Sequence, residues 1–274
     1  MAARRWLGWM VGAVALAAAC RVDAPDLAGY SFLCEGEEDC PAGQRCQDGV
    51  CEPDPGNGDA DPDDPDASVD PSLLAHLPLD LLSGDESPDV AGDHAASCET
   101  GSCPLTATGQ IDGALELDGI DDGMTLAGSG GISPAAGTVA VWLYLPAVPP
   151  AGESMTVVGK AFGTGLENSY ELYVDDGGIP IFYTTAAEIV APSPVPEAAW
   201  VHLAATWTAT TLRLFVDGEP AGSAAGTPTF DGNPVLLGMD RNDGAEDSFL
   251  EGRLDEVRIY DRALDEAEIA GLAE

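Results

Sequence analysis

Seven cysteines are the residues of this sequence whose chemistry is easiest to define. One stands alone near the N-terminus, four follow at separations of four or five intervening residues, and two lie close together further on: Cys20, Cys34, Cys40, Cys46, Cys51, Cys98 and Cys103. Thiols pair as disulfides in an oxidising compartment. Because seven is an odd number, one cysteine must have another task, and Cys20 is the one outside both clusters.

The N-terminal segment predicts an export signal over residues 1–19. Two arginines precede an uncharged apolar run of 14 residues, Trp6–Ala19, whereas a membrane-spanning helix needs about 20 residues. The run ends in Leu16-Ala17-Ala18-Ala19-Cys20, which resembles the lipobox of bacterial lipoproteins. There, the cysteine sulfur receives a diacylglycerol before cleavage on its N-terminal side. Ala17 stands where that motif usually has Leu, so ordinary signal-peptidase cleavage is the alternative.

This resemblance implies a lipoprotein anchored in a membrane through Cys20. Arg21 follows Cys20 where an inner-membrane retention signal has Asp, which favours display at the outer membrane or cell surface over a periplasmic or secreted protein. Lipidation of Cys20 leaves six cysteines, which can pair completely as three disulfides.

Two short segments follow the signal. Residues 20–51 carry four cysteines after Cys20 and too few apolar residues for a core, and they resemble the short cysteine-rich stretches of secreted myxobacterial proteins; the four are Cys34, Cys40, Cys46 and Cys51. Three pairings into two disulfides are open. A zinc site is disfavoured because Cys-x2-Cys spacing and nearby His are missing. Residues 52–71 hold eight acidic and no basic residues among Pro and Gly, which predicts a disordered linker.

Residues 72–274 form the one segment long enough for a sizeable core, and their pattern predicts an all-β domain. In Thr138–Leu145 both alternating sets of side chains are mostly apolar, which favours a central strand covered on both sides. Asp217-Gly218 predicts a hairpin turn, and Asp265 with Glu268 predicts the start of a helix over Leu264–Ala273. The other expected strands are Leu73–Leu79, Ala114–Leu117, Met124–Leu126, Met155–Gly159, Ser169–Val174, Ile179–Thr184, Trp200–Thr208, Thr211–Val216, Pro220–Ala224, Val235–Gly238 and Gly252–Tyr260.

Five ordered motifs in this domain resemble the laminin-G-like or concanavalin A-like modules of bacterial surface proteins. They are Gly113–Asp122, Thr138–Leu143, Trp200–Ala204, Leu214–Gly218 and Gly252–Leu264. The resemblance covers about residues 73–274 and implies a jelly-roll sandwich of two antiparallel sheets. It also implies a short disulfide between Cys98 and Cys103, which precede the first motif.

Calcium is the cofactor that the resemblance implies. The ion would bind near Asp121, Asp122 and Asp255, with Asp80 or Asp89 from the first strand and its loop. Clustered Asp residues and loop carbonyls supply the six to eight oxygens that calcium takes. The alternative is that Asp121 and Asp122 only cap backbone N–H groups of a tight turn. A second candidate for calcium is the acidic loop before the last strand, although a mobile solvated loop is the favoured interpretation; its residues are Asp240, Asn242, Asp243, Glu246 and Asp247.

Aromatic side chains are the candidates for stacking on a sugar ring. Tyr173 and Tyr183 flank a turn at the expected sheet edge, and Asp240 and Asn242 could add polar contacts to a ligand. The tryptophans inside alternating strands, Trp142 and Trp207, are expected to pack in the core, as is His202. The single lysine, Lys160, is expected on the surface.

Charge and motifs together favour a binding role. A net charge of −38 repels nucleic acid and anionic lipid headgroups. The Glu-x-Asp-x-Glu strand of glucanases, Gly-x-Ser-x-Gly and His-Glu-x-x-His are all missing. We therefore expect a non-catalytic surface domain that binds a glycan or a surface protein. A polysaccharide-acting glycoside hydrolase of the same fold and a purely structural surface protein are the alternatives.

Overall fold

A computed structural model describes residues 44–47, 50–53 and 70–274. The chain divides into two compact units, Met1–Ala67 and Ser68–Glu274. In the first, β1 (Gln44–Gln47) and β2 (Val50–Pro53) form an antiparallel pair in which the backbones of Cys46 and Cys51 are partners. The predictions for the signal, for lipidation at Cys20, for Cys34 and Cys40 and for most of the linker fall outside the described residues.

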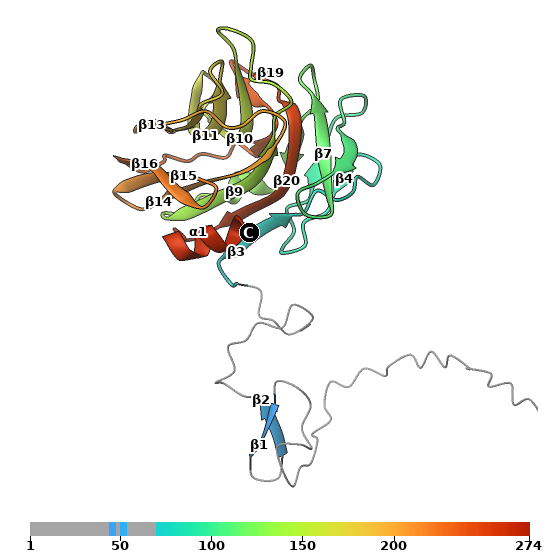
Figure 1. The fold of residues 1–274 in the computed structure, drawn as a ribbon, viewed down its shortest axis with the longest axis vertical. Helices are drawn as coiled ribbons and strands as arrows, with labels where there is room; N and C mark the ends of the chain where they lie inside the picture. The colour runs from blue at the N-terminus through green and yellow to red at the C-terminus, as the bar shows by residue number, and fades with distance from the viewer. Residues whose placement is uncertain (1–43, 48–49, 54–69) are drawn as a thin grey trace, which may run out of the picture. The chain divides into compact units, whose positions relative to one another are not determined.

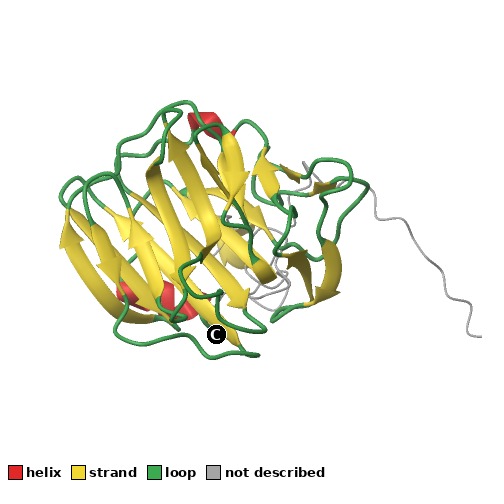
Figure 2. Ribbon diagram, turned by 90° about the horizontal axis from the view of Figure 1, so that it is seen from above, coloured by secondary structure: helices red, strands yellow, loops and turns green. Residues whose placement is uncertain are grey.

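The second unit is a sandwich of two antiparallel sheets (Figures 1 and 2). We call them the β10 sheet and the β9 sheet. The β10 sheet has the order β13 (Glu188–Val190), β12 (Pro180–Tyr183), β11 (Glu167–Asp175), β10 (Ser154–Phe162), β17 (Val235–Leu237), β8 (Met124–Leu126), β5 (Ala96–Ser97), β4 (Glu86–Ser87). The β9 sheet has the order β16 (Glu219–Ala225), β15 (Thr211–Val216), β14 (Trp200–Trp207), β9 (Gly137–Tyr144), β20 (Glu251–Tyr260), β7 (Gly113–Asp118), β6 (Leu105–Thr108), and β3 (Leu73–Leu77) also pairs with β20.

The two stacked antiparallel sheets confirm the predicted jelly-roll fold class. The strand β9 also agrees with the prediction of a central strand that is covered on both faces. Val139, Val141 and Leu143 point into the main core between the sheets. The alternate residue Ala140 lies on the other face, where it packs in a second cluster with Ile269 of the helix α1 (Glu266–Leu272). Both faces of the strand are therefore covered, as its apolar pattern predicts. Figure 1 shows α1 lying against the outer side of the β9 sheet.

The helix α1 begins at the predicted cap. The Asp265 side chain accepts hydrogen bonds from the backbone N–H groups of Ala267 and Glu268, and the Glu268 side chain accepts one from the Asp265 N–H. This reciprocal arrangement satisfies N–H groups that the first helical turn leaves without partners. Among the described residues no helix is long and apolar enough to cross a membrane.

Lys160 lies in the core, so the prediction that places it on the surface was wrong. Its side chain is 0% exposed, and its Nζ donates hydrogen bonds to the carbonyl oxygens of Ser129, at 3.2 Å, and Asn233. The reason is a β-bulge in β10, where the pairing with β11 shifts between Thr156 and Val158. One extra residue in a strand exchanges the inward and outward positions beyond it.

Six short strands of the second unit were not expected from the sequence: β4, β5, β6, β13 and the hairpin β18 (Asp240–Asn242) and β19 (Ala245–Asp247). Each has two to four residues, which is too short for a reliable alternation. The hairpin replaces the expected solvated loop. Its backbone is held near β10 and β11 by hydrogen bonds from Thr156 N to Ser248 O and from Asp243 N to Gly165 O.

Cys98 and Cys103 form the disulfide that the family resemblance implies, in the loop between β5 and β6. Replacing both with Ser should lower the free energy of unfolding by about 2 kcal/mol, because the bridge closes a loop with a sequence separation of five residues. Urea denaturation of the variant and the wild-type protein measures this difference. An unchanged midpoint and slope would show that the bridge does not restrict the unfolded chain.

Candidate functional site

Three aspartates meet in the turn that follows β7. Carboxylate oxygens of Asp118, Asp121 and Asp122 all lie within 4.8 Å of one another. The turn is held by its own side chains: Asp118 Oδ1 accepts from Ile120 N at 2.9 Å, and Asp122 Oδ2 accepts from Asp118 N at 3.1 Å. Burial and the negative charge of Asp118 raise the pKa of Asp122. This oxygen set fits calcium, and the same residues also make the turn.

The other three aspartates proposed as calcium ligands are not in this cluster. Asp80 accepts from Gly113 N at 2.7 Å, at the opposite end of β7. Asp255 Oδ2 accepts from the N–H groups of Gln110 and Ile111, both at 2.9 Å, in the loop between β6 and β7. Asp89 binds the N–H groups of His76, Ala91 and His94. These carboxylates hold loops in place, whereas Asp121 and Asp122 converge with Asp118.

Asp255 gives this sandwich a dependence on pH. Burial, together with the neighbouring Glu256, raises the pKa of its carboxyl to about 7. The two hydrogen bonds from backbone N–H groups lower this pKa, but their effect is smaller. Because the folded-state pKa lies above the ordinary 3.8, the protonated acid stabilises the fold below about pH 4, and this contribution is lost as the pH rises through about 7.

The variant Asp255→Asn should remove this dependence. With a chelator present, we measure the melting temperature of the variant minus that of the wild-type protein. This difference should increase from pH 5 to pH 8 by on the order of 5 °C. Circular dichroism melts measure the shift. The exposed Asp243, changed to Asn, is the control and should show no such trend. An equal difference between Asp255→Asn and wild type at both pH values would contradict the assignment.

Two tyrosines lie together on the outer face of the β10 sheet. Tyr170, Leu172 and Val174 of β11 point into the core, so the alternate residues face away from it. In the register of β11 with β12, Tyr183 is opposite Glu171 and Tyr173 is opposite Ile181. The two rings are therefore diagonal neighbours on one face.

Carboxylates hold both tyrosine hydroxyls. Tyr183 Oη donates to Glu167 at 2.9 Å, and Tyr173 Oη donates to Glu188 at 3.4 Å. Burial and these carboxylates raise the pKa of both phenols. Both rings are half-buried, and Val190 beside them on β13 is exposed. We call Glu167, Tyr173, Tyr183, Glu188 and Val190 the tyrosine face. It offers apolar ring surface next to hydrogen-bond acceptors.

A network of carboxylates and amides borders the tyrosine face. Thr156 Oγ1 donates to Glu171 at 2.6 Å, and Asn168 Nδ2 donates to Glu171 at 3.0 Å and to Asp240 at 2.9 Å. Asn242 Nδ2 then joins Asp240, at 3.0 Å, to Asp247, at 2.9 Å. Burial and the charge of Asp240 raise the pKa of Glu171 to about 7. The structure thus brings Asp240 and Asn242, expected from the sequence, to Glu171 and Asn168, which were not.

A different group of buried aromatic side chains belongs to the core. Trp207 is fully buried and stacks on Tyr170. Trp142 packs edge-on against His202, with ring centroids 5.2 Å apart. Burial and the nearby Arg258 lower the pKa of His202 to about 4, so this imidazole is neutral at pH 7 and, being buried, has no access to a substrate.

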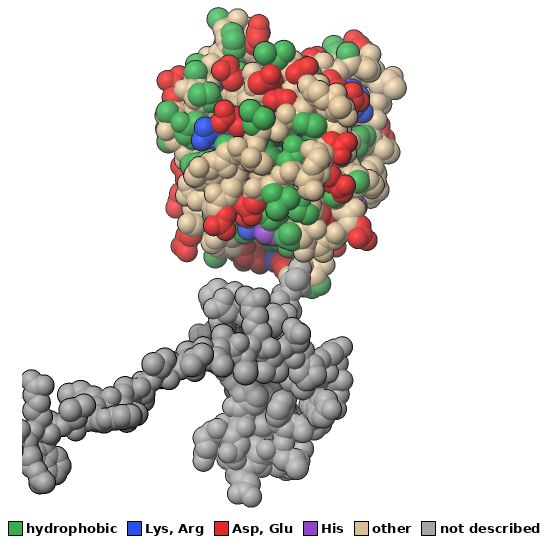
Figure 3. All heavy atoms as spheres, turned by 90° about the vertical axis from the view of Figure 1, so that its right-hand side faces the viewer, with side chains coloured by type: hydrophobic (Ala, Val, Ile, Leu, Met, Phe, Trp, Pro, Cys, Tyr) green, Lys and Arg blue, Asp and Glu red, His purple; other side chains and the backbone are tan. Residues whose placement is uncertain are grey.

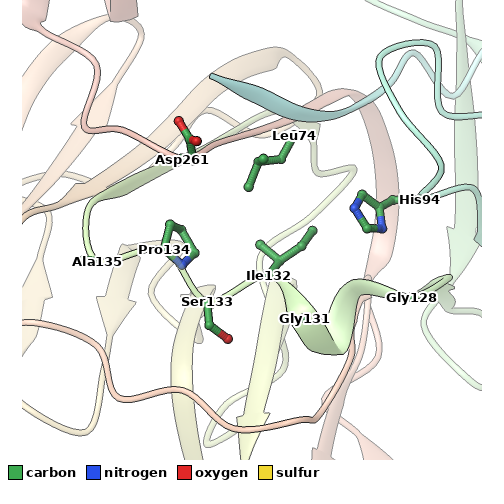
Figure 4. A pocket seen from close by; sticks show the side chains of 9 residues that line it. All are labelled: Leu74, His94, Gly128, Gly131, Ile132, Ser133, Pro134, Ala135 and Asp261. Atoms are coloured by element: carbon green, nitrogen blue, oxygen red, sulfur yellow. The ribbon is translucent and has the colours of Figure 1, made fainter. Parts of the chain in front are cut away.

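The two cavities described next are not lined by residues of the tyrosine face. One of about 560 Å³ has His94 and Asp261 on opposite sides with Leu74 and Ile132 between them, and no Phe, Tyr or Trp lines it (Figure 4). A second, of about 410 Å³, is lined by Tyr144 and Arg253. Acidic side chains are spread over the face shown in Figure 3, with few basic ones among them.

Comparison with known families adds to this geometry. A family model described as the concanavalin A-like lectin/glucanases superfamily matches residues 118–270. The chain belongs to this superfamily. The match covers the acidic turn, the tyrosine face and most of α1, and the sandwich described above is the fold of the concanavalin A-like proteins. No curated protein matches the chain in sequence.

Solved structures similar to this concanavalin A-like domain include both binding domains and parts of enzymes. Domain 4 of AbnA, a GH43 extracellular arabinanase from Geobacillus stearothermophilus solved with arabinotriose, has 20% identity and a TM-score of 0.58, covering 74% of this chain and 98% of that one. Trypanosoma rangeli sialidase has 17% identity and a TM-score of 0.57, and the similarity covers 74% of this chain and 32% of the sialidase chain.

A third similar structure is the binding domain of Paraclostridial Mosquitocidal Protein 1, with 16% identity, a TM-score of 0.56, and coverage of 74% of this chain and 52% of that one. This chain therefore spans about a third of the sialidase and about half of the mosquitocidal binding domain. At these identities the likeness is one of fold.

Proposed function

We propose that this protein displays a non-catalytic carbohydrate-binding domain outside the cytoplasm and that the tyrosine face contacts the glycan. The observation that carries the proposal is the pairing of Tyr173 and Tyr183 on neighbouring strands, each with its hydroxyl held by a carboxylate. Fixed rings lose little conformational freedom when a sugar stacks on them, and nearby carboxylates accept hydrogen bonds from sugar hydroxyls. The arabinotriose bound to the similar arabinanase domain supports this ligand class.

The display itself rests on the N-terminal sequence. A signal peptide over residues 1–19, a lipid on Cys20 and the acidic linker would hold the domain at the outer membrane or cell surface, with the membrane as a partner through the anchor. A protein ligand on the same cell surface is the second class of partner. Nucleic acid is disfavoured as a partner because of the charge of −38.

The non-catalytic assignment is supported by the burial of one member of the carboxylate pair that borders the tyrosine face. Glu171 and Asp240 share the Asn168 amide, a closeness that a glycosidase would use. However, Asp240, the first residue of β18, is only 2% exposed. A sugar ring on the tyrosine face therefore cannot contact both carboxylates in this conformation.

Calcium is the proposed structural cofactor, at the turn after β7. Asp118, Asp121 and Asp122 would hold the ion, which would supply a positive charge that offsets their mutual repulsion. Asp121 also accepts a hydrogen bond from Ser102, in the disulfide loop, at 3.2 Å. An ion at this turn would therefore stiffen the region that joins β7 to that loop.

Loss of either ring should weaken glycan binding. A glycan array on wild-type protein, with and without chelator, identifies a ligand; isothermal titration calorimetry then compares Tyr173→Ala and Tyr183→Ala with it. We expect at least about a tenfold rise in Kd for each variant, as for aromatic residues central to an interface. Tyr144→Ala, which removes a half-buried tyrosine of the β9 sheet, is the control and should bind like wild type. The absence of glycan binding in both array conditions, or equal affinities for all variants, would refute the proposal.

The acidic turn has a separate test. Calcium should raise the melting temperature of the wild-type protein, and Asp121→Asn should reduce that rise because one ligand at the turn loses its charge. Differential scanning calorimetry with calcium and with chelator measures both effects. The control is Asp112→Asn, an exposed residue at the other end of β7. If Asp121→Asn and Asp112→Asn respond to calcium alike, the ion does not bind at this turn.

A further inference from the structure

The end of the sandwich that contains β3 to β8 is strongly acidic. Residues 73–126 contain eleven acidic side chains and no Lys or Arg. Among the described residues, Glu116 is the only one of the eleven that pairs with a Lys or Arg, and its partner is Arg253 of β20, at 2.6 Å. The eleven are Asp80, Asp85, Glu86, Asp89, Asp93, Glu99, Asp112, Glu116, Asp118, Asp121 and Asp122. This end of the domain therefore attracts cationic groups.

Apolar side chains are exposed at the same end. Seven large hydrophobic side chains of the described residues are exposed, and five of them lie in residues 73–126: Leu81, Val90, Leu105, Ile111 and Ile120. Figure 3 faces the side on which Figure 1 shows β4 and β7, and hydrophobic and acidic side chains are interspersed there. Leu105 and Ile111 belong to one hairpin, formed by β6 and β7. Exposed apolar groups among polar ones are typical of protein-binding surfaces.

The strand β6 has backbone groups that point to an open edge. Within the described residues it is the last strand of the β9 sheet and pairs only with β7. In the turn between them, Gly109 N donates to Asp112 O at 3.2 Å. Because antiparallel partners alternate between pairs that exchange hydrogen bonds and pairs that do not, this bond places Thr106 and Thr108 in pairs of the second kind. Their N–H and C=O groups face away from β7 and bond to no other backbone group among residues 70–274.

The other outer strands of the two sheets have features that block pairing. The strand β16 contains Pro220 and a bulge in its pairing with β15. The strand β3 is covered where Val90 N donates to His76 O at 2.8 Å. The strands β4 and β13 have two and three residues, one of them a glutamate in each. In contrast, β6 has no proline, no charged residue and no bulge in its pairing with β7. Since prolines, charges and bulges are the usual protection of edge strands, β6 is left open to pairing.

We propose that the open edge of β6 binds an extended, basic segment of a partner protein, which adds a strand to the β9 sheet. The backbone of that segment pairs with the N–H and C=O groups of Thr106 and Thr108. One of its apolar side chains contacts Leu105, and its Lys or Arg side chains lie near the carboxylates of this end. An anionic partner is repelled here, and a metal ion does not bind N–H donors. This surface shares no residue with the tyrosine face and does not depend on glycan binding.

The probe is a fluorescein-labelled peptide of about eight residues, the length of an ordinary strand, in which Lys and Val alternate. A matched peptide has Glu in place of Lys. Fluorescence anisotropy measures binding of each peptide to the full chain in calcium-free buffer, and we expect saturable binding of the Lys–Val peptide alone. Leu105→Lys should raise its Kd by at least about tenfold, because a charge that repels the peptide replaces the apolar contact. The control is Leu166→Lys, which changes an equally apolar side chain, 67% exposed, between β10 and β11; it should have a much smaller effect.

A proline tests the backbone pairing separately. Thr106→Pro removes an N–H group that faces the open edge, so the domain should keep the circular dichroism spectrum of the wild type but lose the peptide. Thr106→Val keeps this N–H group and should bind the peptide like wild type. If Thr106→Pro proves unfolded, hydrogen exchange of the wild-type protein replaces it, because bound peptide should slow the exchange of the Thr106 and Thr108 N–H groups. Unchanged affinity in Thr106→Pro, or unchanged exchange where that measurement is needed, would overturn the proposal.

Two further results would also contradict it. The first is a Lys–Val peptide that does not bind wild type, or that Leu105→Lys and Leu166→Lys weaken equally, because attraction by charge alone would then account for the data. The second concerns a second copy of the chain as the occupant of the edge. Sedimentation velocity should find wild type monomeric, and a dimer that Thr106→Pro converts to monomers would assign the edge to self-pairing instead.

Discussion

The sandwich depends on how one strand, β20, pairs along both of its edges. One edge pairs with β9 along most of its length, and the other pairs first with β7 and then with β3. The change of partner coincides with a bulge, where the pairing with β9 shifts between Asp255 and Arg258 and Glu256 takes a φ of 55°. A non-glycine residue in this conformation is costly, so its surroundings must stabilise it.

Those surroundings are polar and largely buried. The Glu256 carboxylate is bound by His76, at 2.8 Å, and by Arg258. Asp255, the preceding residue, binds the loop between β6 and β7. The side chains at the bulge thus hold two segments against β20: β3, which is the first strand of the domain, and the loop between β6 and β7. The position of β7 in turn determines where the acidic turn at its end lies.

The sequence predicted the regular parts of this architecture because alternation depends only on neighbouring residues. The apolar pattern of β9 and the capping box of α1 are local signals, and both predictions agree with the structure. A bulge, in contrast, arises from the fit between two strands, so the inward position of Lys160 was not visible in the chain. The same limit applies to the candidate site. Asp240 and Asn242 were found from the acidic segment, but Asn168 is 72 residues from Asp240 and only the pairing of the sheet brings them together.

Lys160 also has a consequence for chemical detection of this protein. It is the only lysine among 274 residues, and its amine points into the core with two backbone carbonyls as partners. The folded domain therefore presents no side-chain amine to reagents such as activated esters or aldehydes. Labelling or cross-linking through amines would be limited to the α-amino group of the chain. Carboxylate-directed reagents, for which the acidic surface offers many sites, are the suitable choice for mapping it.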